Sequence, residues 1–283
     1  MNRRLISFGN STISIVCGDG RPAELVDFLF QNIPPAESGK PWTQLRLKRP
    51  PGVEGLNLWQ DDTLLSQNEP AADMAHTLMS QACYTLAYES RDGLLLHAAA
   101  VQLAGIGLVL PGKTGAGKST LSAWLLSQGG RYLTDEMVFV PTNGDAFSGF
   151  ARPLTIKPTA RHLMPALLSG PVDDSDILRG EPVDMVQPES FGAKLHVGDS
   201  PLDLIVFPTY RPDHDLELNR LTKAAAAYEL MRCLANARNL ADHGLPEALR
   251  LANAVPAYAL SYSDLEQAGR SIIQLLQNQP APQ

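Results

Sequence analysis

The sequence has few cysteines and no cluster of them. Only three occur among 283 residues, and Cys17, Cys83 and Cys233 are far apart and form no Cys-x-x-Cys pair. This spacing predicts neither a disulfide framework nor a zinc site, and it is typical of a protein in a reducing compartment. We therefore expect a cytoplasmic protein.

An excess of positive charge and a long apolar run are also missing. The formal net charge is -7 and the pI is about 5.4, so the totals offer no field that attracts nucleic acid or anionic lipid. The most apolar stretch, residues 94–110, contains His97 and Gln102 and is shorter than the roughly 20 residues that span a bilayer. The N-terminal stretch is a poor secretory signal. We expect neither nucleic acid nor a membrane as a partner.

The remaining composition is that of a globular protein, with 44% hydrophobic and 19% charged residues. From residue 94 onward, strand-like and helix-like segments alternate, which predicts an α/β fold with helices packed on a sheet. We expect residues 1–90 to form a smaller mixed α/β region that packs on a core formed by residues 91–277. We expect residues 278–283 to be a frayed tail. Residues 168–190 are rich in proline, glycine and aspartate without periodicity, which predicts a loop.

Hydrophobic periodicity and turn residues predict the individual elements. The expected strands are 12–17, 44–48, 56–60, 63–66, 94–102, 107–110, 131–133, 137–141, 202–207 and 257–262. The expected helices are 23–32, 70–88, 119–127, 223–236, 246–254 and 264–277.

The strongest motif is the segment GKTGAGKS at residues 112–119, which fits G-x-x-x-x-G-K-[ST]. Its glycines allow backbone N–H groups to surround phosphates, its lysine reaches the β- and γ-phosphates, and its serine binds magnesium. An ordinary glycine turn is the alternative, but the apolar strand before and the helix after favour a P-loop. We expect ATP and Mg²⁺ as cofactors, bound by Gly112, Lys113, Thr114, Gly115, Ala116, Gly117, Lys118, Ser119 and Thr120.

Two acidic residues, Asp135 and Glu136, follow a short predicted strand after the P-loop helix. A carboxylate at this place can hold magnesium or accept the proton of a substrate hydroxyl. A solvated turn with two surface carboxylates is the alternative interpretation. His97 lies on an apolar strand, where a lone histidine is more often a core residue than a catalytic one.

The order Leu96-His97-Ala98, then Gly112–Thr120, then Arg131–Glu136 resembles the HPr(Ser) kinase/phosphatase family. The length and the segment Ala151-Arg152-Pro153-Leu154 look more like the HprK-related kinases, of type A. The resemblance covers residues 94–160 well. It implies a P-loop kinase core of the HPr kinase/PEP carboxykinase type. We expect the protein to lack the separate N-terminal domain of that family, and a homo-oligomer stays open because members of the family assemble into oligomers.

The resemblance also implies roles for individual residues. Asp135 would be the general base and His97 would orient it, while Lys118 would neutralise phosphate charge. Glu136 stands where the family has a second aspartate and would help Ser119 to hold magnesium. Arg152 and Lys157 are candidate contacts for phosphate or substrate, with surface charges as the equal alternative.

The leading hypothesis is therefore an ATP-dependent kinase that transfers the γ-phosphate to a serine-like hydroxyl on a small protein or peptide. The reverse dephosphorylation stays open. One alternative is a small-molecule kinase of the same fold; a carboxykinase-like enzyme is disfavoured because His162, His196 and His214 lack metal-ligand spacing. Another alternative is an ATP-binding sensor or assembly module without catalysis.

Overall fold

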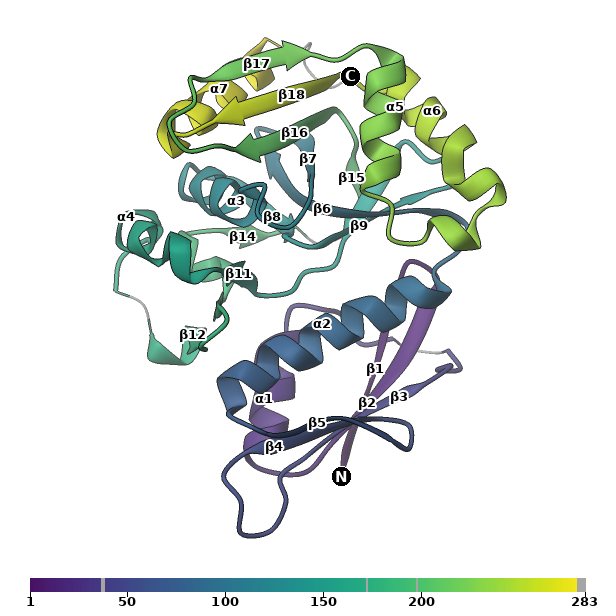
Figure 1. Ribbon diagram of the computed structural model, residues 1–283, viewed down its shortest axis with the longest axis vertical. Helices are drawn as coiled ribbons and strands as arrows, with labels where there is room; N and C mark the ends of the chain where they lie inside the picture. The colour runs from purple at the N-terminus through teal and green to yellow at the C-terminus, as the bar shows by residue number, and fades with distance from the viewer. Residues whose placement is uncertain (37–38, 172, 197, 279–283) are drawn as a thin grey trace.

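A computed structural model of the protein describes residues 1–36, 39–171, 173–196 and 198–278 (Figure 1). Over these residues the chain is a mixed α/β protein with a five-stranded, a ten-stranded and a three-stranded sheet. The tail predicted at 278–283 lies, apart from Asn278, outside the described residues.

The N-terminal part of the chain forms the five-stranded sheet, in the order β1-β2-β3-β4-β5. Its strands are β1 (Asn2–Phe8), β2 (Ser11–Cys17), β3 (Gln44–Lys48), β4 (Leu56–Gln60) and β5 (Thr63–Glu69). Only β2 and β3 pair in parallel, and helix α1 (Arg21–Phe30) lies in the connection between them. Helix α2 (Ala71–Glu89) follows β5 and leads into the rest of the chain. Strand β1 was not predicted from the sequence.

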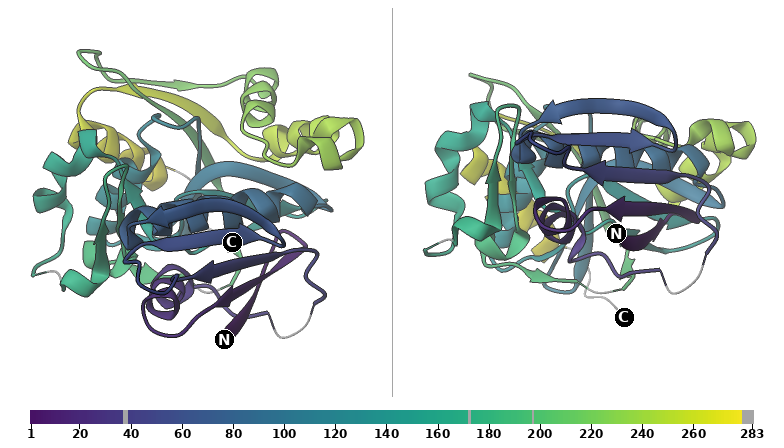
Figure 2. Two further views of the ribbon diagram at one scale, coloured as in Figure 1. Left: turned by 60° about the horizontal axis from the view of Figure 1, so that its bottom comes forward. Right: turned by 90° about the horizontal axis from the view of Figure 1, so that it is seen from below.

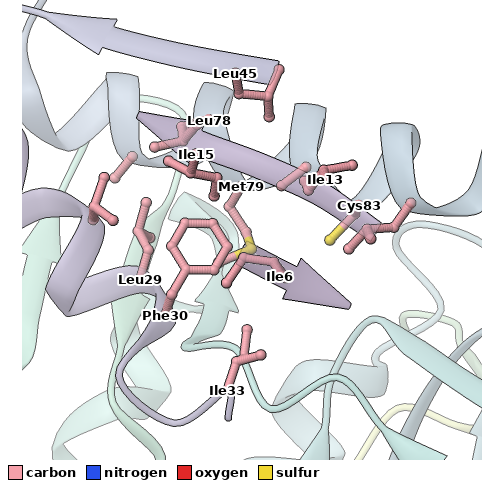
Figure 3. Packing of buried hydrophobic residues seen from close by; sticks show 14 of the residues in the cluster. Ile6, Ile13, Ile15, Leu29, Phe30, Ile33, Leu45, Leu78, Met79 and Cys83 are labelled. Atoms are coloured by element: carbon pink, nitrogen blue, oxygen red, sulfur yellow. The ribbon is translucent and has the colours of Figure 1, made fainter. Parts of the chain in front are cut away.

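Alternation along the strands decides which face of this sheet is covered. In β3, Leu45 and Leu47 are fully buried, while Gln44, Arg46 and Lys48 point to the other face. Helices α1 and α2 pack on the apolar face, where their side chains meet those of the strands (Figure 3). The same buried cluster continues into the larger part of the molecule, through residues that include Leu95, Met137, Phe139, Phe150, Val183 and Met185.

The ten-stranded sheet has the order β15-β10-β9-β6-β7-β16-β18-β17, with β8 on β6 and β14 on β8. Strands β7, β16 and β18 run parallel to one another in its centre. Strand β7 is buried on both faces, as its unbroken apolar sequence requires. The strands are β6 (Gly93–Leu103), β7 (Ile106–Pro111), β8 (Arg131–Thr134), β9 (Met137–Pro141), β10 (Ala146–Gly149), β14 (Lys194–Leu195), β15 (Ser200–Pro201), β16 (Leu204–Tyr210), β17 (Glu217–Arg220) and β18 (Ala257–Tyr262).

Helices cover both faces of this sheet. On each face a separate apolar cluster forms between the helices and the strands. Helices α3 (Lys118–Ser127) and α7 (Leu265–Gln277) belong to one cluster, and α5 (Lys223–Arg232) and α6 (Leu245–Ala254) to the other. Figure 1 shows the two pairs on different sides of the strands. Most residues of α3 are buried all round, as expected for a helix enclosed by other elements.

The prediction of a loop without regular structure at residues 168–190 is wrong. The structure has β12 (Ile177–Arg179) and β13 (Asp184–Val186) in this stretch, and they pair with β11 (Leu154–Ile156) in the order β11-β13-β12. Strands of three residues are too short to show alternation, and β11 precedes them by a long interval, so local sequence carries no signal for them. Short helix α4 (Met164–Leu167) lies beside this sheet.

The helix predicted at 223–236 ends earlier than expected. Helix α5 stops at Arg232, and the next residues run along β6 instead, where Cys233 O accepts from His97 N and Ala235 N donates to Leu95 O. Buried Asn236 accepts from Leu95 N through its side chain and donates to the backbone of Ser90 and Gly93. Short 3-10 turns complete the chain at Pro158–Leu163, Asp174–Asp176, Pro188–Phe191, Ala237–Asn239 and Ala241–Gly244.

Helix α2 lies between the five-stranded sheet and the rest of the molecule (Figure 1), and the sheet faces outward on its far side, as the view from below shows (Figure 2). Contacts of α2 with β12 and β13 join the two parts. None of the helices in the described part of the chain combines the length and apolarity needed to cross a bilayer.

Candidate functional site

The glycine-rich segment 112–117 connects the end of buried β7 to the start of α3. Backbone hydrogen bonds hold it at both ends: Gly112 N donates to His97 O at 3.3 Å, and Tyr210 N donates to Ala116 O at 3.1 Å. Within it, Ala116 N donates to Lys113 O at 3.1 Å. The loop is therefore fixed between β6 and β16, the two neighbours of β7.

Two glycines of this loop have left-handed backbone conformations, Gly115 with φ 88° and Gly117 with φ 92°. A Cβ on Gly117 would meet the Tyr262 hydroxyl at 2.1 Å, whereas a Cβ on Gly115 would meet no atom within 4 Å. Gly117 is thus required by backbone conformation and by close approach, and Gly115 by conformation alone.

We expect these two glycines to respond differently to alanine. Gly115→Ala should lower the free energy of unfolding by about 1–2 kcal/mol through its left-handed conformation. Gly117→Ala should add a further loss of about 1–3 kcal/mol from the overlap with Tyr262. Chemical denaturation of both variants measures this difference.

A double-mutant cycle isolates the cause. In a Tyr262→Phe background the hydroxyl is gone, so Gly117→Ala should cost less there than in the parental chain. Equal costs in both backgrounds would contradict the overlap.

Lys118 is the first residue of α3, and its side chain folds back over the loop. Its ammonium group donates to Gly112 O at 2.7 Å and to Lys113 O at 3.3 Å, and it lies 3.2 Å from His97 Nε2. The residue is 6% exposed. Burial lowers the pKa of Lys118, and Glu136 and Asp135 oppose this effect. A buried cation surrounded by carbonyls is suited to an anionic ligand that enters the loop.

Asp135 follows β8 and is 1% exposed. Its Oδ2 accepts from Thr155 N at 2.9 Å, and its Oδ1 has no hydrogen-bond partner among the described residues. Burial raises the pKa of Asp135, while the Arg152 guanidinium, with its Nε 3.8 Å from Oδ1, lowers it. Ser119 also lies close enough to lower this pKa.

Glu136 is the more accessible of the two acids, with a side chain that is 34% exposed. Its Oε1 lies 3.3 Å from His97 Nε2, and its Oε2 lies 3.3 Å from Arg152 Nη1. Burial lowers the pKa of His97, and neighbouring Lys118 lowers it further. His97 therefore lies between the ammonium of Lys118 and the carboxylate of Glu136, and it contacts Glu136 rather than Asp135.

Arg152 contacts both acids of this charge cluster. It is buried, with 3% of the residue exposed. Its guanidinium pairs with Asp135 and Glu136 and donates to Thr155 Oγ1. The two carboxylates raise the pKa of Arg152 against the opposing effect of burial. Arg152 thus holds both acids in place, and because it also lines the cleft, the predicted contact with phosphate or substrate stays a prediction.

A cleft of about 1530 Å³ joins these groups. It is lined by Lys118, Ser119, Thr120, Asp135, Glu136, Arg152, His97 and Lys157, and by every loop residue from Gly112 to Gly117 except Ala116. All other candidate residues of the sequence therefore face one space. Several parts of its lining carried no signal in the sequence, among them Thr155, the turn that follows β18 at Ser263, and the face of α2 with His76, Ser80 and Tyr84.

The donors near Ser119 fit a magnesium ion. Hydroxyl and carboxylate oxygens are the hard ligands that Mg²⁺ prefers, and Mg²⁺ needs only one or two of them from the protein. Asp135 Oδ1 is a buried oxygen with no hydrogen-bond partner among the described residues, and Glu136 supplies the more accessible carboxylate. Glu136 would first have to release His97 or Arg152. No group of three or more His, Cys, Asp or Glu side chains that could hold a metal occurs in the described ranges.

The comparisons with known proteins give a distant structural similarity. No family model matches the sequence, and no curated protein matches it. Among solved structures, the chain is similar to the HPr(Ser) kinase/phosphatase from Coxiella burnetii, with 12% sequence identity and a TM-score of 0.35. The match covers 65% of this chain and 88% of that chain.

Proposed function

We propose that the protein is an ATP-dependent kinase that transfers the γ-phosphate to a serine-like hydroxyl on a small protein or peptide. One observation carries the proposal: the loop 112–117, with the buried ammonium of Lys118 folded over it, opens into the same cleft as Asp135 and Glu136. A cation beside backbone N–H groups suits phosphate, and carboxylates suit a hydroxyl that must lose its proton.

In the proposed reaction, the protein acts mainly by positioning and charge. The loop and the N-terminus of α3 hold the phosphates, and Lys118 neutralises charge on the β- and γ-oxygens. Asp135 accepts the proton of the acceptor hydroxyl, for which a raised pKa is favourable because the carboxylate becomes a stronger base. Ser119 would hold Mg²⁺, together with Glu136 after its release from Arg152, and the ion would supply further neutralisation of phosphate charge.

Arg152 supports this role through the two acids. It is buried and paired with both of them, so its charge keeps Asp135 ionised at a pH where burial alone would favour the neutral acid. His97 lies beside Lys118 and Glu136 and would orient both. His97 is therefore proposed as a positioning residue for Glu136 and Lys118.

Labelled ATP separates this function from its alternatives. The purified chain, Mg²⁺ and γ-labelled ATP are incubated with cell extract, and proteins, peptides and metabolites are separated afterwards. A labelled protein or peptide with phosphoserine supports the proposal. A labelled metabolite identifies a small-molecule kinase instead, and ATP binding without any labelled product identifies a sensor or assembly module.

A further inference from the structure

The cleft is larger than a nucleotide requires. Binding pockets for small molecules and cofactors usually measure about 300–1000 Å³, whereas this cleft measures about 1530 Å³. Its lining includes the glycine-rich loop with the turn after β18, residues around α4, residues 232–235, and a wall formed by one face of α2 with His76, Ser80, Cys83, Tyr84 and Ala87. This α2 wall contains no part of the glycine-rich motif, so it can contact a second ligand.

The α2 wall begins beside the acidic pair. Burial lowers the pKa of His76, and the next causes of its shift are the charges of Arg152 and Glu136. Residues four apart on a helix share a face, so His76, Ser80, Tyr84 and Tyr88 form one stripe along α2. From the first to the last of them the stripe is about 18 Å long at the usual rise of an α-helix.

Exposed aromatic rings continue this stripe out of the cleft. Tyr84 is 62% exposed, and its ring centroid lies 6.3 Å from that of Tyr88. Tyr88 in turn stacks on Trp42 at 5.6 Å, and these two are 40% and 41% exposed. The guanidinium of Arg238 lies 3.7 Å from the centre of the Tyr88 ring and fixes it. Clustered exposed aromatic side chains are typical of protein-binding surfaces, because they offer large contact area at little cost in entropy.

We propose that the α2 stripe and the row of Tyr84, Tyr88 and Trp42 bind an extended polypeptide segment of the acceptor and lead its hydroxyl to Asp135 and Glu136. This inference rests on the proposed kinase function and names its acceptor class. A stripe of about 18 Å matches about five residues of extended chain, which exceeds the reach of a small metabolite. The row is continuous with the cleft, so one ligand occupies both. The acceptor therefore carries an apolar or aromatic residue about five positions from its phosphorylated serine.

A serine-centred peptide library tests this inference with the full chain. The peptides are about 13 residues long, so that they reach the aromatic row on either side of the serine. They are incubated with γ-labelled ATP and Mg²⁺, and each flanking position is scanned. We expect selection for apolar or aromatic residues about five positions from the serine. In Trp42→Ala and in Tyr84→Ala this selection should disappear, and kcat/KM for the preferred peptide should fall about tenfold or more.

Tyr228→Ala is the matched control. Tyr228 is also an exposed tyrosine beside an arginine, Arg232, but it does not line the cleft. Its peptide selection and kcat/KM should equal those of the parental chain. The KM for ATP should stay within twofold in Trp42→Ala, because the effect is confined to the acceptor.

Four outcomes overturn the inference, and they show whether ATP-dependent phosphate transfer itself survives. Unchanged selection in Trp42→Ala and Tyr84→Ala, or no selection at any position, would refute the binding of the acceptor by the aromatic row. Phosphate transfer to peptides would remain intact. Labelling of a metabolite in extract but of no peptide would refute the polypeptide acceptor of both proposals while leaving ATP-dependent phosphate transfer intact. Absence of ATP binding in calorimetry would refute the kinase function itself and this inference with it.

Discussion

Replacing Lys118 by alanine should reduce phosphate transfer by about a thousandfold. The ammonium is the buried cation of the glycine-rich loop, and it is held at 2.7 Å by Gly112 O in a place where phosphate charge would develop. Removing one charge-stabilising donor from a site that excludes water costs about 10²–10³-fold in other enzymes. Initial rates with saturating Mg·ATP measure the effect.

Lys118→Arg and Lys113→Ala separate charge from geometry. Arginine keeps the positive charge, but its planar fork cannot replace a compact ammonium between Gly112 O and Lys113 O, so a large loss should remain. Lys113 is an exposed lysine of the same loop, and its alanine variant should lose less than about tenfold. Thermal unfolding of all three variants shows that each chain is folded. A Lys118→Ala protein that keeps transfer within tenfold of the parental rate would refute the phosphate site.

Much of the fold was predicted because the main sheet and its helices have strong local patterns. The strand at 44–48 was predicted with its observed bounds, and the strand at 257–262 likewise, since alternation and flanking turn residues mark both. Strand β1 was missed because it starts the chain and its exposed residues blur the alternation. The small sheet around β13 depends on pairing with distant β11, and pairing between distant short strands leaves no periodic signal.

The candidate site was predictable where a motif fixes spacing, and not where tertiary packing decides. Residues 112–120 and 135–136 are recognisable from the chain itself. Two relations at the site required the structure: Arg152 pairs with both acids, and His97 contacts Glu136. The α2 wall could not be predicted at all, because its residues read as one ordinary amphipathic helix until the fold sets that helix beside the loop.

Replacing Asp135 by asparagine should lower phosphate transfer by about 10²–10⁴-fold, because a general base contributes about that much. Asparagine keeps the shape and can still accept from Thr155 N, so the chain should fold and bind ATP. Glu136→Gln is the matched variant, with the same chemical change in the adjacent acid, and its loss should be clearly smaller. Rates and ATP affinities of both proteins decide the assignment; a larger loss in Glu136→Gln would move the base to Glu136.

The pH dependence of phosphate transfer is a second, independent test of Asp135 as the general base. A base must be ionised, so kcat/KM falls as the pH drops through the pKa of Asp135. Burial raises this pKa. The fall of kcat/KM on the acidic side of the pH profile, its acidic limb, should therefore lie above the pH range in which an ordinary aspartate titrates. Arg152 opposes that shift, and Arg152→Met should therefore move the limb to still higher pH. Arg152→Lys keeps a cation and should leave the limb closer to the parental position.

These two arginine variants also distinguish charge from folding. Loss of a buried partner costs about 3–5 kcal/mol of stability, so Arg152→Met is measured at a temperature where its unfolding curve shows a fully folded chain. A merely structural role for Arg152 would lower the rate equally at every pH, whereas a role through the Asp135 carboxylate moves the limb itself. The limb must vanish in Asp135→Asn if this carboxylate is its source, and a limb that persists there at the parental pH would assign the titration to a different group.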